Sequence, residues 1–210
     1  MNELEIQKIN GYIDLENIKV PNWKVLLSSY FFFMIISIPT ALYGSMNELT
    51  NQMIGSWVII LGIWTLYFIF NKHDENSYVL YMGMISVFTS ITALIATFEM
   101  LNLLIDVNYS LIIIVVLIYL GLLGVNIWNI IRLVKKGYFL DPQKSSRTNY
   151  GLILGTSVLG IGVARAFFGG VGNDKAIMII VSVLVFFVLV FLSGTHNFLK
   201  YYYIRITNVN

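Results

Sequence analysis

Long apolar runs separated by short polar segments are the main pattern along this chain. Six runs are each long enough to cross about 30 Å of hydrocarbon as a helix. They cover residues 23–43, 53–70, 78–98, 110–134, 150–168 and 176–192. The pattern therefore predicts an all-α integral membrane protein, organised as a bundle of six transmembrane helices.

The same pattern divides the chain into three parts. We expect residues 1–22 to form a cytoplasmic N-terminal segment, 23–197 a single transmembrane domain and 198–210 a cytoplasmic tail. Ile6, Ile9 and Ile13 follow helical spacing, but Gly11 interrupts it, so an interfacial helix and a loosely ordered tail are both open readings. No cleavage motif follows the first polar segment, which favours a retained first span over a signal peptide.

Basic residues gather on one side of the predicted bundle. If the N-terminus is inside, eleven Lys and Arg residues lie in inner segments, and only Arg165 and Lys175 lie in outer ones. The densest group is the connector 132–147, with Arg132, Lys135, Lys136, Lys144 and Arg147. Basic residues mark cytoplasmic span ends. We therefore expect both termini to be cytoplasmic.

Composition supports the membrane assignment and narrows the classes of function. Hydrophobic residues make up 58% of the 210 residues, charged residues 11%, and the mean hydropathy is +0.78, whereas about a quarter of residues are charged in soluble domains. A net charge of +2, with basic residues at span ends, gives no support for a nucleic-acid partner. The absence of cysteine rules out disulfides and Cys-ligated metals. Abundant Ile, Asn, Lys and Tyr suggest a bacterial source, hence the bacterial cytoplasmic membrane.

Small residues form stripes on the third and fifth predicted spans. Because residues three and four apart share a helix face, each stripe permits close approach of another helix. We predict that the two spans pack together as parallel neighbours. The predicted seam comprises Gly83, Ser86, Ser90, Ala93 and Thr97 on the third span and Gly151, Gly155, Gly162 and Ala166 on the fifth. The sixth span is rich in Val, Ile and Phe, and we expect it to present much of its surface to lipid.

Three polar side chains are candidate site residues. Glu99 and Arg165 close the third and fifth spans on the predicted outer side. If those spans pack together, the two charges form an ion pair at the floor of an outward-facing recess. The alternative is that each reaches separately into the headgroup layer. Asn126 is the most deeply placed strongly polar side chain, and we expect it to hydrogen-bond between helices.

Motifs that carry chemistry are largely missing from the sequence. His73 and His196 are isolated and lack a second ligand one helical turn away, so no metal site is predicted. The stretch Gly155-Thr156-Ser157-Val158 approaches the motif of intramembrane serine proteases but ends in Val158 instead of glycine. We therefore predict no catalytic residues, no cofactor and no enzymatic activity.

The leading functional hypothesis is a non-enzymatic membrane protein that binds another protein, as a toxin-immunity or secretion-accessory factor. The alternative is a small-molecule transporter subunit that works with an ATPase partner. Small immunity proteins, substrate-binding subunits of importers and permease subunits of exporters all share this layout of spans and short loops, and layout alone does not establish homology. The expected partners are the lipid bilayer and a toxin, secretion component or transporter subunit.

The predicted topology is testable with reporter fusions. Because the inner segments hold most of the basic residues, a reporter that is active only outside the membrane should work after Asn47 and Asp106. It should be inactive after Gln143. External activity at Gln143 would contradict the predicted orientation.

Overall fold

Every regular element among the described residues is a helix. The computed structural model describes residues 3–13, 20–44, 48–71, 75–105, 107–140 and 173–207. Its elements are α1 (Glu3–Ile13), α2 (Trp23–Tyr43), α3 (Glu48–Phe70), α4 (Glu75–Asn102), α5 (Tyr109–Lys135), the 3-10 helix η2 (Tyr138–Leu140), α7 (Asn173–Ser193) and α8 (His196–Thr207).

Five stretches of these residues are long and apolar enough to cross a membrane: α2, α3, α4, α5 and the consecutive α7 and α8. The predicted all-α, multi-pass membrane class is therefore confirmed. The predicted span 150–168 lies outside the described residues. The helices also extend beyond the apolar runs. For example, α3 begins at Glu48 and α4 ends at Asn102, because polar residues at a helix end continue the helix past the hydrocarbon.

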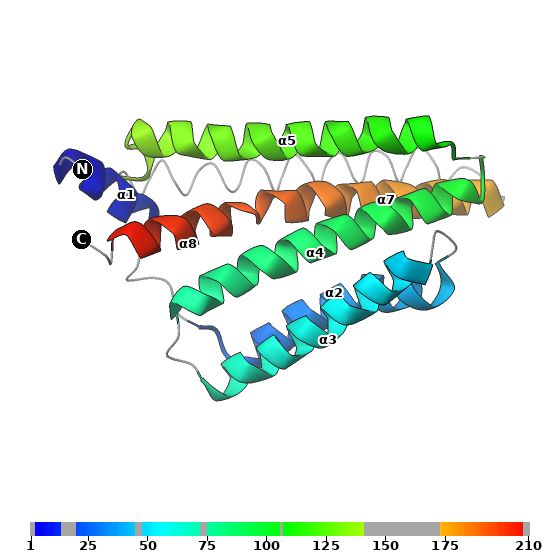
Figure 1. Ribbon diagram of the computed structural model, residues 1–210, viewed down its shortest axis with the longest axis horizontal. Coiled ribbons are helices and arrows are strands. Elements are labelled where there is room, and N and C mark those ends of the chain that lie inside the picture. Colours follow the sequence, from blue (N-terminus) through cyan, green and yellow to red (C-terminus); the bar gives the residue numbers. More distant parts are fainter. Residues whose placement is uncertain are drawn as a thin grey trace.

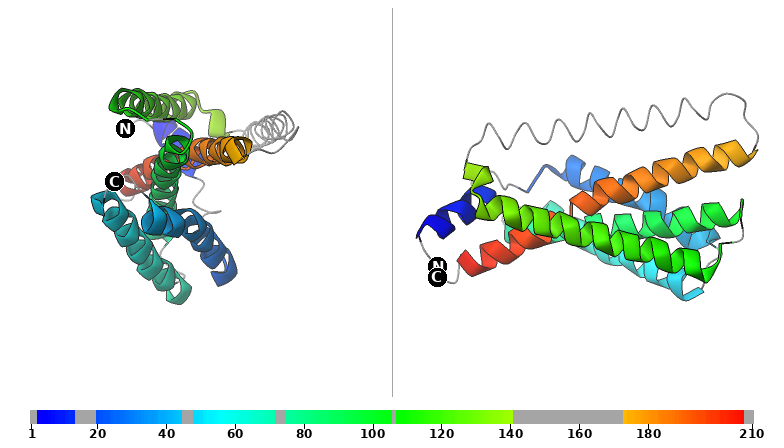
Figure 2. Two further views of the ribbon diagram at one scale, coloured as in Figure 1. Left: turned by 90° about the vertical axis from the view of Figure 1, so that its right-hand side faces the viewer. Right: turned by 90° about the horizontal axis from the view of Figure 1, so that it is seen from above.

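Helix α4 is the central element of the bundle. It crosses the molecule between the α2–α3 hairpin on one side and α7 with α8 on the other, while α5 lies beyond α7 (Figures 1 and 2). Of the 18 most apolar consecutive residues of each helix, 56% are buried inside the molecule in α4, compared with 22% in α3 and 6% in α5. The small residues of α4 account for this position, because they let neighbouring helices approach closely.

The predicted small stripe of α4 faces α7 and α8. Gly83 lies beneath the ring of Phe198, and a methyl group added to Gly83 would be 3.2 Å from that ring. One turn further along, Ser86 packs against Gly194. The Ser90 hydroxyl then donates a hydrogen bond of 3.0 Å to the Val188 carbonyl. The bulky side chains of α7 therefore fit a shallow face on α4, and the rest of α7 remains partly exposed.

The α2–α3 hairpin packs on α4 through a separate apolar cluster. Its buried members are Leu26, Phe33, Leu61, Phe68, Tyr81 and Ile85. Hydroxyl groups in this cluster are hydrogen-bonded. Tyr30 donates to the Val58 carbonyl at 2.8 Å, and the Thr65 and Tyr81 hydroxyls share a hydrogen bond of 2.8 Å. Gly62 makes the first bond possible, since a methyl group there would lie 2.6 Å from the Tyr30 hydroxyl oxygen.

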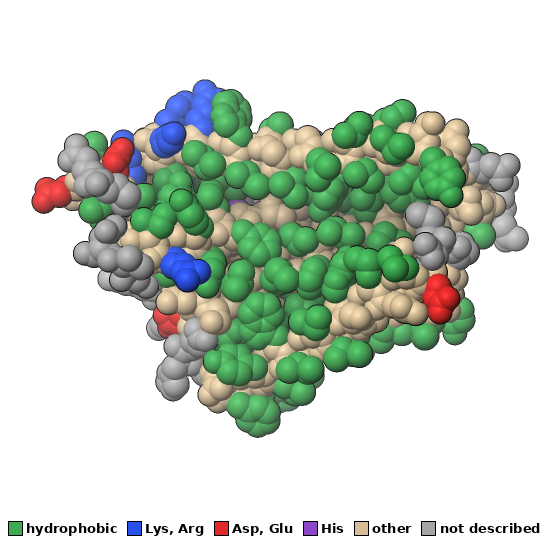
Figure 3. Space-filling view, viewed as in Figure 1, with side chains coloured by type: hydrophobic (Ala, Val, Ile, Leu, Met, Phe, Trp, Pro, Cys, Tyr) green, Lys and Arg blue, Asp and Glu red, His purple; other side chains and the backbone are tan. Residues whose placement is uncertain are grey.

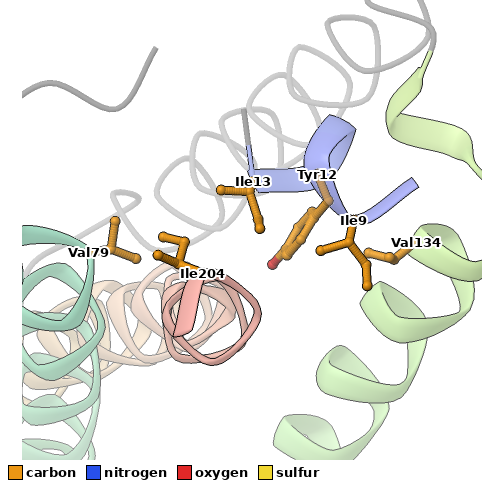
Figure 4. Packing of buried hydrophobic residues seen from close by; sticks show 6 residues of the cluster. All are labelled: Ile9, Tyr12, Ile13, Val79, Val134 and Ile204. Carbon is orange, nitrogen blue, oxygen red and sulfur yellow. The ribbon is translucent and has the colours of Figure 1, made fainter. Parts of the chain in front are cut away.

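Helix α1 covers one end of the bundle. Its side chains Ile9, Tyr12 and Ile13 are buried together with residues from α4, α5 and α8, namely Val79, Val134 and Ile204 (Figure 4). Lys and Arg side chains gather toward the same end (Figure 3). Helix α5 ends here at Lys135 and is followed by Gly137, whose φ of +69° is the left-handed conformation that commonly terminates helices. The start of α1, the end of α5 and the end of α8 thus share one end of the molecule (Figure 1).

The contact between α4 and the α7–α8 junction at Gly194 should be sensitive to one added methyl group. In Gly194→Ala the new carbon would lie 2.8 Å from the Cβ of Ser86 and 3.3 Å from the Phe191 carbonyl oxygen. Overpacking of this kind costs about 1–3 kcal/mol, so the thermal midpoint in detergent should fall.

The matched control is Gly55→Ala in α3, because no atom of the described residues lies within 4 Å of the added carbon there. Its midpoint should stay constant or rise slightly, since alanine favours the helix over glycine. Equal losses in the two variants would show that the Gly194 contact is not tight.

Candidate functional site

The break between α7 and α8 interrupts an apolar stretch, Ile177–Thr207, that is long enough to cross a membrane. At Gly194 and Thr195 the backbone hydrogen bonds join residues three apart, as in a 3-10 helix, instead of four apart. The Gly194 N–H donates to the Phe191 carbonyl at 3.0 Å, and the Thr195 N–H donates to the Leu192 carbonyl at 3.2 Å. The Thr195 hydroxyl also donates to the Leu192 carbonyl at 2.7 Å. Hydrocarbon cannot hydrogen-bond to the backbone, so such a break persists only where the protein supplies partners.

Asn126 of α5 supplies one partner for the break. Its side-chain Nδ2 donates to the Leu192 carbonyl at 3.2 Å and lies 3.3 Å from the Thr195 hydroxyl. Asn126 is nine residues from the end of α5 at Lys135, which is about 14 Å along the helix axis. The amide therefore lies within the hydrocarbon depth, where a hydrogen bond between helices stabilises their association.

Helix α1 supplies a second partner. The Tyr12 hydroxyl donates to the His196 carbonyl at 3.1 Å, and the Lys8 ammonium donates to the Lys135 carbonyl at 3.0 Å. Burial, and then the neighbouring Tyr203, raise the pKa of the Tyr12 phenol above its usual range. The phenol therefore stays protonated, so it remains a donor, and α1 connects the first residues of α8 to the end of α5.

A recess of about 320 Å³ opens between α5 and α7 beside this break. It is lined by Leu122, Val125, Asn126, Trp128, Asn129, Leu189, Leu192 and Ser193. Its apolar residues lie on both helices, while two amides and one hydroxyl lie toward the basic end. Amide and hydroxyl groups both donate and accept hydrogen bonds, so the recess combines an apolar wall with polar groups at one end. Another recess, of about 430 Å³, lies over α3 beside Trp64 and has mostly apolar walls.

Glu99 lies at the opposite end of the bundle, beside the end of α2. A side chain on Gly44 would collide with the Glu99 carboxylate and with the Thr40 carbonyl, so glycine makes room for the acid. Asn51 donates to the Gly44 carbonyl at 3.1 Å from the neighbouring helix α3. Arg165 lies outside the described residues, and its pairing with Glu99 stays a prediction.

The predicted seam is described on its α4 side only. Gly83, Ser86 and Ser90 contact α7 and α8, and Ala93 packs in a cluster with Val188 of α7. The second half, Gly151, Gly155, Gly162 and Ala166, lies outside the described residues. A direct contact between the third and fifth spans therefore also stays a prediction.

Sequence reasoning missed the break itself. Five small or polar residues, Ser193 to Asn197, follow the apolar run of α7. In the sequence, these five residues suggest only that a span ends there. The signal that was available is the resumption of apolar residues at Phe198, with aromatic residues continuing to Tyr203. That pattern is typical of a helix that restarts.

The described residues bring together no set of groups typical of a hydrolase or a metal centre. The His196 ring nitrogen Nδ1 lies 2.8 Å from the Ser193 carbonyl, while Ser157 and His73 lie outside the described ranges. No group of three His, Asp or Glu residues within those ranges is placed to hold a metal ion. Comparison with protein-family models, curated proteins and solved structures finds no match to this chain.

The hydrogen bonds at the break should be energetically coupled. Asn126→Ala and Thr195→Val each remove a donor to the Leu192 carbonyl, and each should cost about 0.5–2 kcal/mol in detergent. Because the two side chains also contact each other, the double variant should lose less than the sum, with a coupling of about half a kcal/mol or more.

The control for this cycle is Asn129→Ala, since Asn129 is exposed on the same helix. Its effect on the thermal midpoint should be small. Strict additivity of the Asn126 and Thr195 losses would show that the two groups act independently.

Proposed function

We propose that this protein acts by binding another membrane protein, through the exposed side of α5, in the bacterial cytoplasmic membrane. The observation that supports the proposal is the position of α5. Only 6% of its most apolar window is buried against the rest of the molecule. The exposed side carries large apolar groups and glycines in an order suited to receive a second helix.

One face of α5 forms a notch, which we call the α5 notch. Leu117, Gly121, Gly124 and Trp128 follow one another at spacings of three or four residues, so they share this face. Leu117 and Trp128 are 62% and 60% exposed, and no atom of the described residues lies within 4 Å of a methyl group placed on either glycine.

The shape of the α5 notch favours a helix over lipid as its occupant. Helices in a membrane associate through van der Waals packing and hydrogen bonds, and small residues let their backbones approach closely. Glycine also lowers helix stability by about 1 kcal/mol relative to alanine. Two glycines on an exposed face therefore weaken α5 unless close approach of a partner compensates.

The class of partner distinguishes the candidate functions. A membrane-active toxin or a secretion component would support an immunity or accessory role. An ATPase or permease would support the alternative, a small-molecule transporter subunit, which is favoured by the partly polar recess between α5 and α7.

A photo-reactive amino acid at Leu117, activated in native membranes, tests the proposal. It should cross-link the protein to a second protein, which mass spectrometry then identifies. Gly121→Ile with Gly124→Ile fills the notch and should lower the cross-linking yield about tenfold, the equivalent of about 1.4 kcal/mol.

The control is Gly55→Ile on α3, where the described residues also leave the glycine side open. It should leave the yield unchanged. A cross-link only to another segment of the same chain, or a yield that the notch variants do not change, would refute partner binding at this face.

A further inference from the structure

Two cations lie on the same face of α5 as the residues that line the recess between α5 and α7. The Arg132 guanidinium carbon lies 5.5 Å from the centre of the Trp128 ring, and Trp128 lines the recess. Arg132 follows Asn129 by three residues, and Lys136 follows Arg132 by four, so all three lie on one face of α5. Both cations are exposed.

Polarity in this recess changes in steps along α5. Arg132 and Lys136 are at the end, Asn129 is about 4.5 Å deeper than Arg132, and Asn126 is about 9 Å deeper. Beyond Asn126 the lining is apolar, with Leu122, Val125 and Leu189. Across the recess, Ser193 of α7 is exposed and adds a hydroxyl. From the helix end inward, the groups along the recess are therefore cations, then amides and a hydroxyl, then apolar side chains.

A phospholipid presents the same order of groups along its length. Its phosphate lies at the membrane surface, its glycerol esters lie just below, and its acyl chains extend inward. Arginine matches phosphate oxygens with two parallel hydrogen bonds, and basic pockets between membrane helices on the cytoplasmic side are suited to anionic headgroups. The α5 segment contains no acidic residue to oppose that charge.

We propose that the recess between α5 and α7 is a binding site for one anionic phospholipid. Arg132 and Lys136 bind its phosphate and headgroup, Asn129 and Ser193 hydrogen-bond its glycerol esters, and an acyl chain lies along Leu122, Val125 and Leu189. The bound lipid fills the space between α5 and α7 beside the break. The recess borders the α5 notch and shares Trp128 with it, but neither proposal requires the other.

Fluorescence quenching by brominated lipids tests the site, because Trp128 lines it. The purified protein is placed in bilayers that hold equal fractions of phosphatidylglycerol and phosphatidylcholine, with bromine on the acyl chains of one or the other. The parent protein carries Trp23→Phe, because Trp23 is 46% exposed and lipid would quench it as well. The signal of the partly buried Trp57 and Trp64 is subtracted by means of the variant that also carries Trp128→Phe. Trp128 should be quenched preferentially by brominated phosphatidylglycerol, with an association constant about fivefold higher than for phosphatidylcholine.

Two charge variants distinguish a specific site from general attraction to a negative surface. Arg132→Gln with Lys136→Gln should reduce the preference to about one. Lys135→Gln is the matched control, because Lys135 lies at the edge of this face, about 60° around the helix from Arg132 and about 100° from Lys136. It should retain most of the preference. Adding Trp128→Phe should remove the difference in quenching between the two lipids.

Three results would overturn the proposal: equal quenching by both lipids in the parent, an unchanged preference in the double variant, or an equal loss in Lys135→Gln. Native mass spectrometry gives a second measurement that does not depend on tryptophan. The parent should retain a phosphatidylglycerol molecule at detergent concentrations at which the Arg132 and Lys136 double variant has lost it. Circular dichroism and the thermal midpoint establish that each variant is folded.

Discussion

The need to hydrogen-bond every backbone polar group at membrane depth shapes this molecule. The break at Gly194 and Thr195 rearranges the bonds of one turn within an apolar stretch that is long enough to cross a membrane, and neighbouring helices supply additional bonds. Asn126 reaches the Leu192 carbonyl from α5, and Tyr12 reaches the His196 carbonyl from α1. These two bonds help to hold α5 and α1 in position, together with the apolar clusters around Tyr119 of α5 and around Ile9 and Ile13 of α1.

Small side chains on α4 make the same arrangement possible from the opposite side. Ser86 leaves space for Gly194, and Ser90 bonds to the Val188 carbonyl. Large residues at these positions would move α7 outward and separate the break from its partners. Helix α5 contrasts with α4, since it is held at its end, at Asn126 and at Tyr119, which is buried in a cluster with Ala93 and Val188. Much of its remaining length is available for lipid or for a second protein.

Hydrophobic pattern alone was sufficient to predict the class of fold, because a span needs only length and apolar character. The sequence also indicated Asn126 and the stripe from Gly83 to Ala93 as packing features. It predicted the fifth span as the partner of that stripe. Among the described residues, α7 and α8 contact it, since small residues permit contact without specifying a partner. The restart at His196 was missed because Ser193 to Asn197 reads equally well as a loop. The recess is formed by two helices that are far apart in the sequence, with Asn129 on α5 and Ser193 on α7. No single stretch of the sequence therefore reveals it.

The position of α1 has a consequence for biosynthesis. Its buried side chains contact Val79, Val134 and Ile204, and Tyr12 bonds to a residue 184 positions later in the chain. Helix α1 therefore has no complete docking surface until α8 has been made. Insertion of the spans and closure of this end are separate events, and a chain released before α8 is complete leaves Ile9, Tyr12 and Ile13 exposed to recognition by quality-control proteases.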